Sequence, residues 1–388
     1  MIDRARRNIS TVTCYRANLS NWRTYPFCNW SFHNVREIVP SAEIRNEPSN
    51  IWPMKYKKAP FRTALLKKLI CKSATDAVVI IQDSNIYFEE YRNGMGPDDQ
   101  HILFSVSKSI LGLVAGCLIH DGVIKEENLI TDYLPEMRGT AYEKATIRHA
   151  LDMLVGVAFN EDYTAEVGPM IDYRHATNWN PTPDSKVATN LKEFLGSLSQ
   201  SSGPHGRNFK YMSPNTDLLA WLFERASKKR YHELISQYLW RPLGSERAAY
   251  ITVDRVGAMR AAGGVCTTAR DLGRLGMLVA QCGKRNSAQI IPKNWILDLY
   301  NGGSQDTWNK GNLREYFSSS SLHYRSKWYV DQSIGRLLFA FGIHGQYLFI
   351  DCERKLSMVW LSSQTSPLDS NTIKNILDQV NVIRIAFD

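Results

Sequence analysis

The segment that most constrains the fold of this chain is 105–121, Ser-Val-Ser-Lys-Ser-Ile-Leu-Gly-Leu-Val-Ala-Gly-Cys-Leu-Ile-His-Asp. Its apolar residues fall on nearly every face, which predicts a helix buried on all sides rather than a surface helix. Gly122 marks its end, and Gly112 and Gly116 leave room for neighbouring elements to approach closely. The chain has 388 residues, 44% of them hydrophobic, which is enough to build a large core around such a helix.

The pattern on either side of this helix predicts strands at both ends of the chain and helices between them. Segments 77–82 and 86–91 flank Asp83-Ser84-Asn85 and indicate a β-hairpin. Further strands are predicted at 324–331, 335–342, 346–351 and 356–362, and helices at 145–154, 190–199, 214–227, 231–240, 268–281 and 371–384. The order favours an α/β (α+β) fold, an antiparallel sheet flanked by helices with an inserted helical part.

This order also predicts a domain division. Residues 1–60, rich in Trp, Tyr, Pro and Asn, are expected to form an extended N-terminal arm. Residues 61–122 and 255–388 are expected to form the sheet domain, and 123–254 a mainly helical domain, with the active site between them.

Charge and cysteine content bear on the partners, the metal and disulfide content and the location of the protein. The net charge is +9, and residues 1–70 hold 13 Lys or Arg against 4 Asp or Glu. One hypothesis is a nucleic-acid or membrane-surface site there; without zinc-finger or RNA-binding motifs we favour a solvated basic surface and no nucleic-acid partner. Seven widely spaced cysteines without C-x-x-C argue against disulfides and metal sites. No secretory signal or 18-residue apolar run occurs, so we expect a cytoplasmic protein without a membrane span.

One catalytic string stands out, the S-x-x-K at Ser105-Val106-Ser107-Lys108. Lys108 lies one turn after Ser105 on the same helix face. Burial lowers a lysine pKa, so Lys108 could accept the proton of Ser105, while the helix N-terminus favours the developing oxyanion. The alternative is that Ser105 caps the helix and Lys108 extends to the surface.

A second candidate is Tyr211-Met212-Ser213-Pro214. Ser213 followed by proline is typical of a helix start, with Ser213 as the N-cap. Tyr211 could carry a proton if a cation such as Lys108 lowers its pKa; the alternative is a packing role.

Together these motifs make the chain resemble the penicillin-recognising serine enzymes, the β-lactamase and transpeptidase superfamily. Within it, the chain is similar to the 6-aminohexanoate-dimer hydrolases and family VIII carboxylesterases over roughly residues 20–385. The segments that carry the resemblance are Asn21-Trp22-Arg23-Thr24, Trp30-Ser31-Phe32, 104–109, Asp162-Tyr163, 211–213, 263–272 and 342–346.

The resemblance implies roles for single residues. Ser105 matches the nucleophile, Lys108 the base and Tyr211 the proton shuttle to the leaving group. Tyr163 matches a tyrosine at the scissile amide, and Ser213 takes a position that holds asparagine in class C β-lactamases. One oxyanion donor would be the Ser105 N–H, and the other Ile343, if Gly342 replaces the glycine of K-T-G, or else Gln346. His344 is a further candidate binding residue, or else a strand residue with satisfied hydrogen bonds.

The chain departs from the family in lacking K-T-G and Tyr-x-Asn, which disfavours a cell-wall or antibiotic-resistance role. We expect a serine hydrolase, a carboxylesterase or amidase, that acts on a small-molecule ester or amide without a cofactor. A homodimer is one candidate assembly. The alternatives are a D-alanyl-peptide hydrolase or weak β-lactamase, and a catalytically silent binding or scaffold relative.

Overall fold

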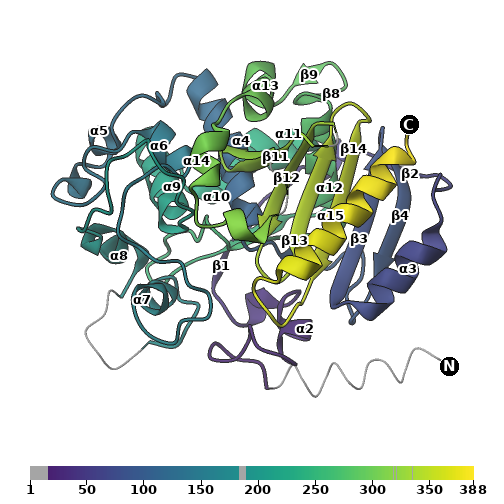
Figure 1. Cartoon of the computed structure of the whole chain (residues 1–388), viewed down its shortest axis with the longest axis horizontal. Coiled ribbons are helices and arrows are strands. Elements are labelled where there is room, and N and C mark those ends of the chain that lie inside the picture. The colour runs from purple at the N-terminus through teal and green to yellow at the C-terminus, as the bar shows by residue number, and fades with distance from the viewer. Residues whose placement is uncertain (1–15, 183–188, 318, 320, 334) are drawn as a thin grey trace.

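The computed structural model describes residues 16–182, 189–317, 319, 321–333 and 335–388. Its largest feature is an eight-stranded sheet in the order β10-β11-β12-β13-β14-β3-β4-β2 (Figure 1). Every neighbouring pair is antiparallel except β2 and β4. The strands are β2 (Lys55–Tyr56), β3 (Thr75–Gln82), β4 (Asn85–Tyr91), β10 (Leu322–Arg325), β11 (Trp328–Asp331), β12 (Leu337–Gly342), β13 (Gln346–Asp351) and β14 (Leu356–Ser362). N- and C-terminal strands thus share one sheet, as the sequence predicts.

The β3–β4 hairpin confirms the turn predicted at residues 83–85. Asp83 and Ser84 connect the strands with φ of 45° and 64°, and Gln82 pairs with Asn85. Two-residue connections with positive φ match the right-handed twist of the strands they join, and Asp tolerates that conformation better than most residues other than glycine.

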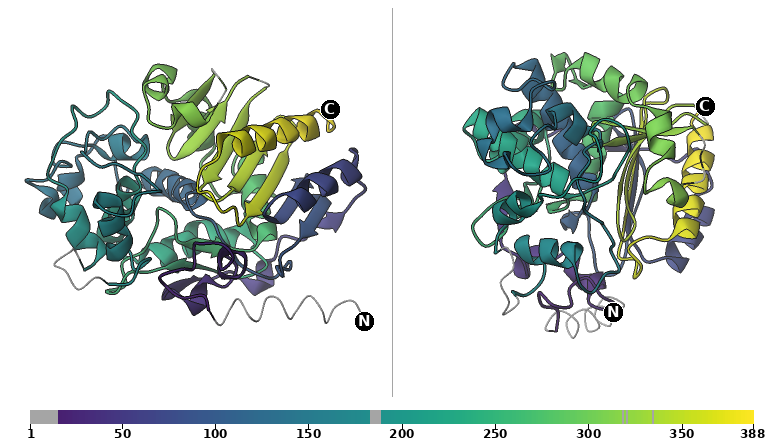
Figure 2. Two further views of the ribbon diagram at one scale, coloured as in Figure 1. Left: turned by 60° about the horizontal axis from the view of Figure 1, so that its bottom comes forward. Right: turned by 60° about the vertical axis from the view of Figure 1, so that its left-hand side comes forward.

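Helices cover both faces of the sheet, because the strand side chains alternate between two cores. Val78 and Ile80 of β3 pack in one apolar cluster with α3 (Thr63–Lys72) and α15 (Ser370–Ile385). Val79 and Ile81 belong to the other cluster, which contains α12 (Ala269–Ala280). The right-hand view of Figure 2 shows the sheet nearly edge-on with α15 along its outer face.

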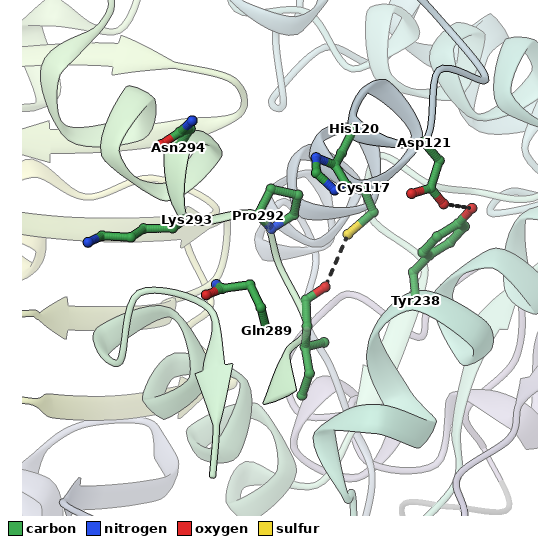
Figure 3. Close-up of a pocket in the computed structure, with 9 residues that line it drawn as sticks. Cys117, His120, Asp121, Tyr238, Gln289, Pro292, Lys293 and Asn294 are labelled. Atoms are coloured by element: carbon green, nitrogen blue, oxygen red, sulfur yellow. Dashed lines mark hydrogen bonds between the residues drawn. The ribbon is translucent and has the colours of Figure 1, made fainter. Parts of the chain in front are cut away.

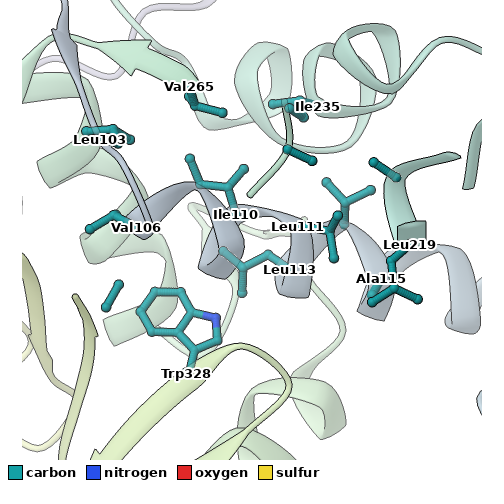
Figure 4. Close-up of a cluster of buried hydrophobic side chains, with 14 of the residues drawn as sticks. Leu103, Val106, Ile110, Leu111, Leu113, Ala115, Leu219, Ile235, Val265 and Trp328 are labelled. Atoms are coloured by element: carbon teal, nitrogen blue, oxygen red, sulfur yellow. The ribbon is translucent and has the colours of Figure 1, made fainter. Parts of the chain in front are cut away.

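The helix predicted at 105–121 is α4 (Val106–His120), and all of its residues up to Leu118 are buried. Figure 4 shows its apolar side chains meeting partners from several elements, among them Leu219, Val265 and Trp328. The two helix glycines allow these contacts: a Cβ at Gly112 would lie 2.1 Å from Ser326 O, and one at Gly116 2.4 Å from the Trp295 ring.

The middle of the chain is mainly helical, as expected, and contributes one strand to a small second sheet. Its helices are α5 (Ile130–Tyr133), α6 (Ile147–Leu151), α7 (Pro169–Ala176), α8 (Leu191–Ser197), α9 (Pro214–Ser227), α10 (Tyr231–Ile235), a π-helix at Ser236–Trp240 and α11 (Arg241–Leu243). Four short strands, β1 (Ser41–Ile44), β5 (His101–Ile102), β6 (Ala249–Thr252) and β7 (Val265–Thr267), form the sheet β1-β6-β7-β5. The boundaries of a separate helical domain at 123–254 stay a prediction.

The described part of segment 1–60 differs from the expected extended arm. Trp22, Phe32 and Val39 are fully buried, and they pack with Phe104 and Trp179 in a third apolar cluster. Helix α2 (Cys28–Ser31) and strand β1 lie in this segment, with short 3-10 turns at Val35–Glu37 and Pro48–Asn50. Its aromatic residues are therefore core residues, packed against the start of α4. Residues 1–15 lie outside the described residues.

Two other expectations need correction. The single strand predicted at 324–331 is wrong: β10 and β11 form a hairpin there, because Ser326 and Lys327 have φ of 47° and 73° and reverse the chain. The helices that the sequence analysis also missed include α3, α7, α13 (Lys293–Asn301) and α14 (Gln305–Asn309). It missed the ribbon of β8 (Lys284–Arg285) and β9 (Ala288–Gln289) as well. Within the described ranges, no helix has the length and apolar character needed to cross a membrane.

Candidate active site

The site begins at the N-terminus of α4, where Ser105 and Lys108 contact each other. Lys108 Nζ lies 2.7 Å from Ser105 Oγ and also donates to the carbonyl oxygen of Ala262 at 2.7 Å. Ser105 occupies the N-cap position, but its side chain makes no capping hydrogen bond. Phe104, just before it, has a φ of 42°, and such strained backbone is common at functional sites. The simple capping interpretation of Ser105 is therefore wrong.

Lys108 is buried, with 1% of its surface exposed. Burial lowers its pKa from 10.5 to about 7; Glu161 and Asp217 oppose this shift, and Arg260 reinforces it. The alternative in which Lys108 extends to the surface is excluded, because its amine faces Ser105 inside the protein. At neutral pH a large fraction of the amine is unprotonated and can accept a proton.

Tyr211 completes the contact around the serine. Its side chain lines the same cavity as Ser105 and Tyr329, and Lys108 Nζ lies 4.9 Å from the centre of its ring. Burial, and next the charge of Glu161, raise the pKa of Tyr211. The idea that Lys108 lowers this pKa is therefore wrong in direction: Tyr211 is a neutral phenol and Lys108 is the stronger candidate base.

Glu161 is a buried carboxylate that the sequence analysis missed. Its Oε1 accepts hydrogen bonds from the Tyr163 hydroxyl at 2.6 Å and from Ser213 Oγ at 2.5 Å, and its Oε2 accepts from the Ser213 N–H. Ser213 precedes α9 as predicted, but its side chain holds Glu161 instead of capping the helix. Glu161 lies in a loop without periodicity, so no sequence pattern marks it.

A second missed group, Asp217, binds the residue whose carbonyl accepts Lys108. Asp217 Oδ1 accepts the Ala262 N–H at 2.8 Å, and its Oδ2 pairs with Arg260. Asp217 and Arg260 are both buried. The ion pair thus anchors Ala262 through its N–H, and the carbonyl of the same residue accepts the Lys108 amine.

The end of β12 lies against the backbone of Ser105. A Cβ at Gly342 would lie 3.0 Å from Ser105 N and 2.7 Å from Leu103 O. Of the two candidate oxyanion donors, Gln346 lies within the β12–β13 ladder opposite Gly342, whereas Ile343 lines the cavity at Ser105. The arrangement favours Ile343.

His344 does not reach this cavity. It is buried, its Nδ1 hydrogen-bonds the carbonyl of Gln364 at 2.6 Å, and its ring packs against Phe32 and Phe104. Burial lowers its pKa to about 4, so it stays neutral. The structure supports the alternative of a satisfied structural histidine.

The cavity beside Ser105 is small and apolar. It holds about 10 Å³ of free space, and its lining residues are Ser105, Tyr163, Tyr211, Leu313, Tyr329, Phe341, Ile343 and Leu368. That is room for about one water molecule, far less than the roughly 300–1,000 Å³ of sites for drug-sized ligands.

A wider hollow, of about 470 Å³, lies at the other end of α4 (Figure 3). It is lined by Cys117, His120, Asp121, Tyr238, Gln289, Ile290, Pro292, Lys293 and Asn294. Burial raises the pKa of the Cys117 thiol to about 12, which makes it a poor nucleophile. By size alone this hollow would be the candidate active site, but its described side chains form no hydrogen-bond network like the one around Ser105.

Among the residues that the structure describes, no group of three or more His, Cys, Asp or Glu side chains could hold a metal ion. The six cysteines in the described ranges are all free thiols.

Comparison with known proteins agrees with this geometry. The family model for beta-lactamase matches residues 67–381. A 6-aminohexanoate-dimer hydrolase from Paenarthrobacter ureafaciens is 33% identical over 352 residues, which cover 90% of this chain and 88% of that protein. The chain therefore belongs to the beta-lactamase family, and it is a hydrolase of that family.

Solved structures are similar over most of the chain. A putative 6-aminohexanoate-dimer hydrolase from Bacillus anthracis has a TM-score of 0.85 and 25% identity, covering 95% of this chain and 96% of its own. A family VIII carboxylesterase has a TM-score of 0.60 at 13% identity, covering 84% and 94%, and shows the fold alone. The fold is of the β-lactamase and transpeptidase type, as expected.

Proposed function

We propose that this chain is a serine hydrolase that cleaves esters of short acyl chains, or small linear amides, through an acyl-enzyme. The observation that carries the proposal is the 2.7 Å contact between Ser105 Oγ and a buried lysine amine whose pKa is lowered to about 7. A serine hydroxyl needs an adjacent base to attack a carbonyl at neutral pH, and Lys108 is such a base.

The proposed reaction has two steps. Ser105 Oγ attacks the substrate carbonyl while unprotonated Lys108 takes its proton, and the N–H groups of Ser105 and Ile343 stabilise the oxyanion. The carbonyl re-forms as the bond to the leaving group breaks, and the proton held by Lys108 passes through the Tyr211 hydroxyl to that group. Water then attacks the acyl-enzyme with Lys108 as base, releasing the acid and restoring Ser105.

Two observations support this substrate class. The relative at 33% identity is called a 6-aminohexanoate-dimer hydrolase, a name that implies cleavage of a linear amide. Apart from Ser105, the cavity is lined by aromatic and aliphatic side chains, which suits an apolar acyl group. An ester needs less catalytic assistance than an amide, because its leaving group departs more readily.

The test is hydrolysis of p-nitrophenyl acetate by the wild type and by Ser105→Ala. Ser109→Ala is the matched control, since Ser109 lies one turn further along α4 and its Oγ donates to the carbonyl of Lys327 instead. We expect saturable turnover that is lost in Ser105→Ala and kept in Ser109→Ala. Equal turnover in the wild type and Ser105→Ala, or none in either, would exclude Ser105 as the nucleophile for this ester.

A further inference from the structure

One tyrosine that lines the cavity at Ser105 has a hydroxyl without a partner. Tyr329, on β11, is 2% exposed and lines that cavity. In the part of the chain that the structure describes, its hydroxyl is buried and makes no hydrogen bond. A buried polar group without a hydrogen bond lowers stability, and such groups are uncommon in folded proteins. At a catalytic site the partner can be supplied during the reaction, since catalytic hydrogen bonds often tighten only when substrate is bound.

Tyr329 lies beside Tyr211. Both side chains line the same cavity, and both rings pack edge-on against Tyr324, with centroids 4.8 Å (Tyr329) and 6.4 Å (Tyr211) from it. Burial, and next the charge of Tyr211, raise the pKa of Tyr329, so its hydroxyl keeps its proton and can donate. Burial is also the largest cause of the raised pKa of Tyr211, and Tyr329 is one of the groups that oppose that rise.

A hydroxyl donor beside Tyr211 meets a need of the proposed reaction. In that reaction Tyr211 passes a proton to the leaving group, and negative charge develops on its oxygen until the proton of Lys108 arrives. The buried surroundings disfavour this charge, which is why the pKa of Tyr211 is raised. A hydrogen bond donated to the oxygen would stabilise the charge as it develops.

We propose that Tyr329 is a positioning residue for proton transfer to the leaving group: its hydroxyl donates a hydrogen bond to the Tyr211 oxygen while Tyr211 gives its own proton away. Tyr329 keeps its proton throughout. The O–H bond of Tyr211 breaks as the O–H or N–H bond of the leaving group forms, and the proton from Lys108 restores Tyr211. This inference rests on the proposed function and makes the hydrolysis of substrates with strongly basic leaving groups depend on Tyr329.

The experiment compares two esters with the same acyl group, p-nitrophenyl acetate and p-nitrobenzyl acetate, in the wild type and Tyr329→Phe. The p-nitrophenolate ion is stable and leaves without a proton, whereas the p-nitrobenzyl alkoxide must be protonated as it leaves. Both esters form the same acyl-enzyme, so a difference between their kcat/KM values reports its formation.

We expect Tyr329→Phe to act on one ester only. It should lower kcat/KM for p-nitrobenzyl acetate by about tenfold to a hundredfold, which is the effect of one hydrogen bond to a charged group. The value for p-nitrophenyl acetate should stay within about twofold of the wild type, because that leaving group needs no proton. A merely structural role of Tyr329 would affect both esters alike.

Tyr347→Phe is the matched control. Tyr347, on β13, is 1% exposed and its hydroxyl is also buried without a hydrogen bond among the described residues. Its ring packs against Phe341, which lines the cavity, but Tyr347 itself does not line it. Its substitution should leave both esters unaffected. Neither variant should lower Tm, because each removes an unpaired hydroxyl and keeps the ring.

A double-mutant cycle tests whether Tyr329 acts through Tyr211. In a Tyr211→Phe background, Tyr329→Phe should change kcat/KM for p-nitrobenzyl acetate by less than about twofold, because the oxygen that Tyr329 serves is gone. Chromatography of the released alcohol follows the slow turnover. A loss in this background as large as in the wild type would overturn the proposed role.

The outcomes separate this inference from the proposed function. Equal losses with both esters, no loss with either, or a selective loss that also appears in Tyr347→Phe overturns the role of Tyr329 alone. A wild type that hydrolyses p-nitrophenyl acetate but not p-nitrobenzyl acetate overturns it as well. Failure of the wild type to hydrolyse either ester, or hydrolysis that survives in Ser105→Ala, overturns the proposed function.

Discussion

Among the residues that the structure describes, two lysines are buried, and their surroundings differ. Lys108 and Lys327 are each 1% exposed, and burial is the largest cause that lowers both pKa values. Lys108 Nζ contacts Ser105 Oγ. Lys327 Nζ donates to the carbonyl of Ala150 at 2.6 Å and lies 3.4 Å from Met153 Sδ. Burial thus lowers the pKa of the amine at both places, but only the Lys108 amine contacts a hydroxyl whose proton it can take.

The charged groups around the two lysines differ as well. Near Lys108, Glu161 holds Tyr163 and Ser213 at the cavity. Near Lys327, Asp152 is bound by Arg148 and Arg325 and accepts the N–H of Ser326. The Glu161 network ends at the cavity beside Ser105. The Asp152 network holds the β10–β11 turn against α6 and the residues that follow that helix. This contrast predicts opposite consequences for equivalent substitutions.

The largest effect is expected from Lys108→Met, which keeps the length of the side chain but removes the amine. Turnover of p-nitrophenyl acetate should fall by about a thousandfold, because general-base catalysis contributes about a hundredfold to ten-thousandfold. Tm should not fall, since the variant no longer buries an amine. Activity within tenfold of the wild type would contradict the role of Lys108.

The next effect is on pH dependence. Lys108 must be neutral to act, and its pKa is about 7, so kcat/KM should be half-maximal near pH 7 and fall tenfold for each pH unit below it. At pH 5 the loss should be about a hundredfold. A profile from pH 5 to 10 measures this. An acid limb centred near the ordinary lysine pKa would show that Lys108 is charged in the free enzyme.

Glu161→Gln should have a smaller effect on rate and a distinctive effect on that profile. An amide nitrogen cannot accept the Ser213 N–H, so we expect about a tenfold loss at pH 8. Because Glu161 raises the pKa of Lys108, its removal should move the acid limb to lower pH. The control is Glu166→Gln, an exposed carboxylate in the same loop. An acid limb that moves upward would refute the coupling.

The smallest effect is expected from Lys327→Met. It removes a buried amine that contacts a backbone carbonyl and a thioether, and apolar replacements of buried charges are often neutral or stabilising. Turnover should stay within about threefold, and Tm should be unchanged or higher. A loss as large as that of Lys108→Met would remove the distinction between the two lysines.

The sequence could predict the elements that have a period and the residues that form a motif. Helix α4, the β3–β4 hairpin and the pairing of Ser105 with Lys108 follow from apolar periodicity, turn residues and spacing. The β10–β11 turn escaped prediction, because Ser326 and Lys327 adopt positive φ although neither is glycine.

The supporting shell of the site could not be predicted, because it depends on contacts between distant segments. Glu161 meets Ser213 across 52 residues and Asp217 meets Ala262 across 45. No local pattern encodes such pairs. The direction of the Tyr211 pKa shift was missed for the same reason, since it follows from burial and from Glu161.

The most direct test of the account is to trap the acyl-enzyme. The wild type is mixed with p-nitrophenyl acetate, quenched with acid within the first turnover and analysed by intact mass and peptide mapping. The account predicts one acetyl group on the peptide that contains Ser105, absent in Ser105→Ala and strongly reduced in Lys108→Met. An acetyl group on another residue, or rapid turnover in which no acylated protein is found, would contradict it.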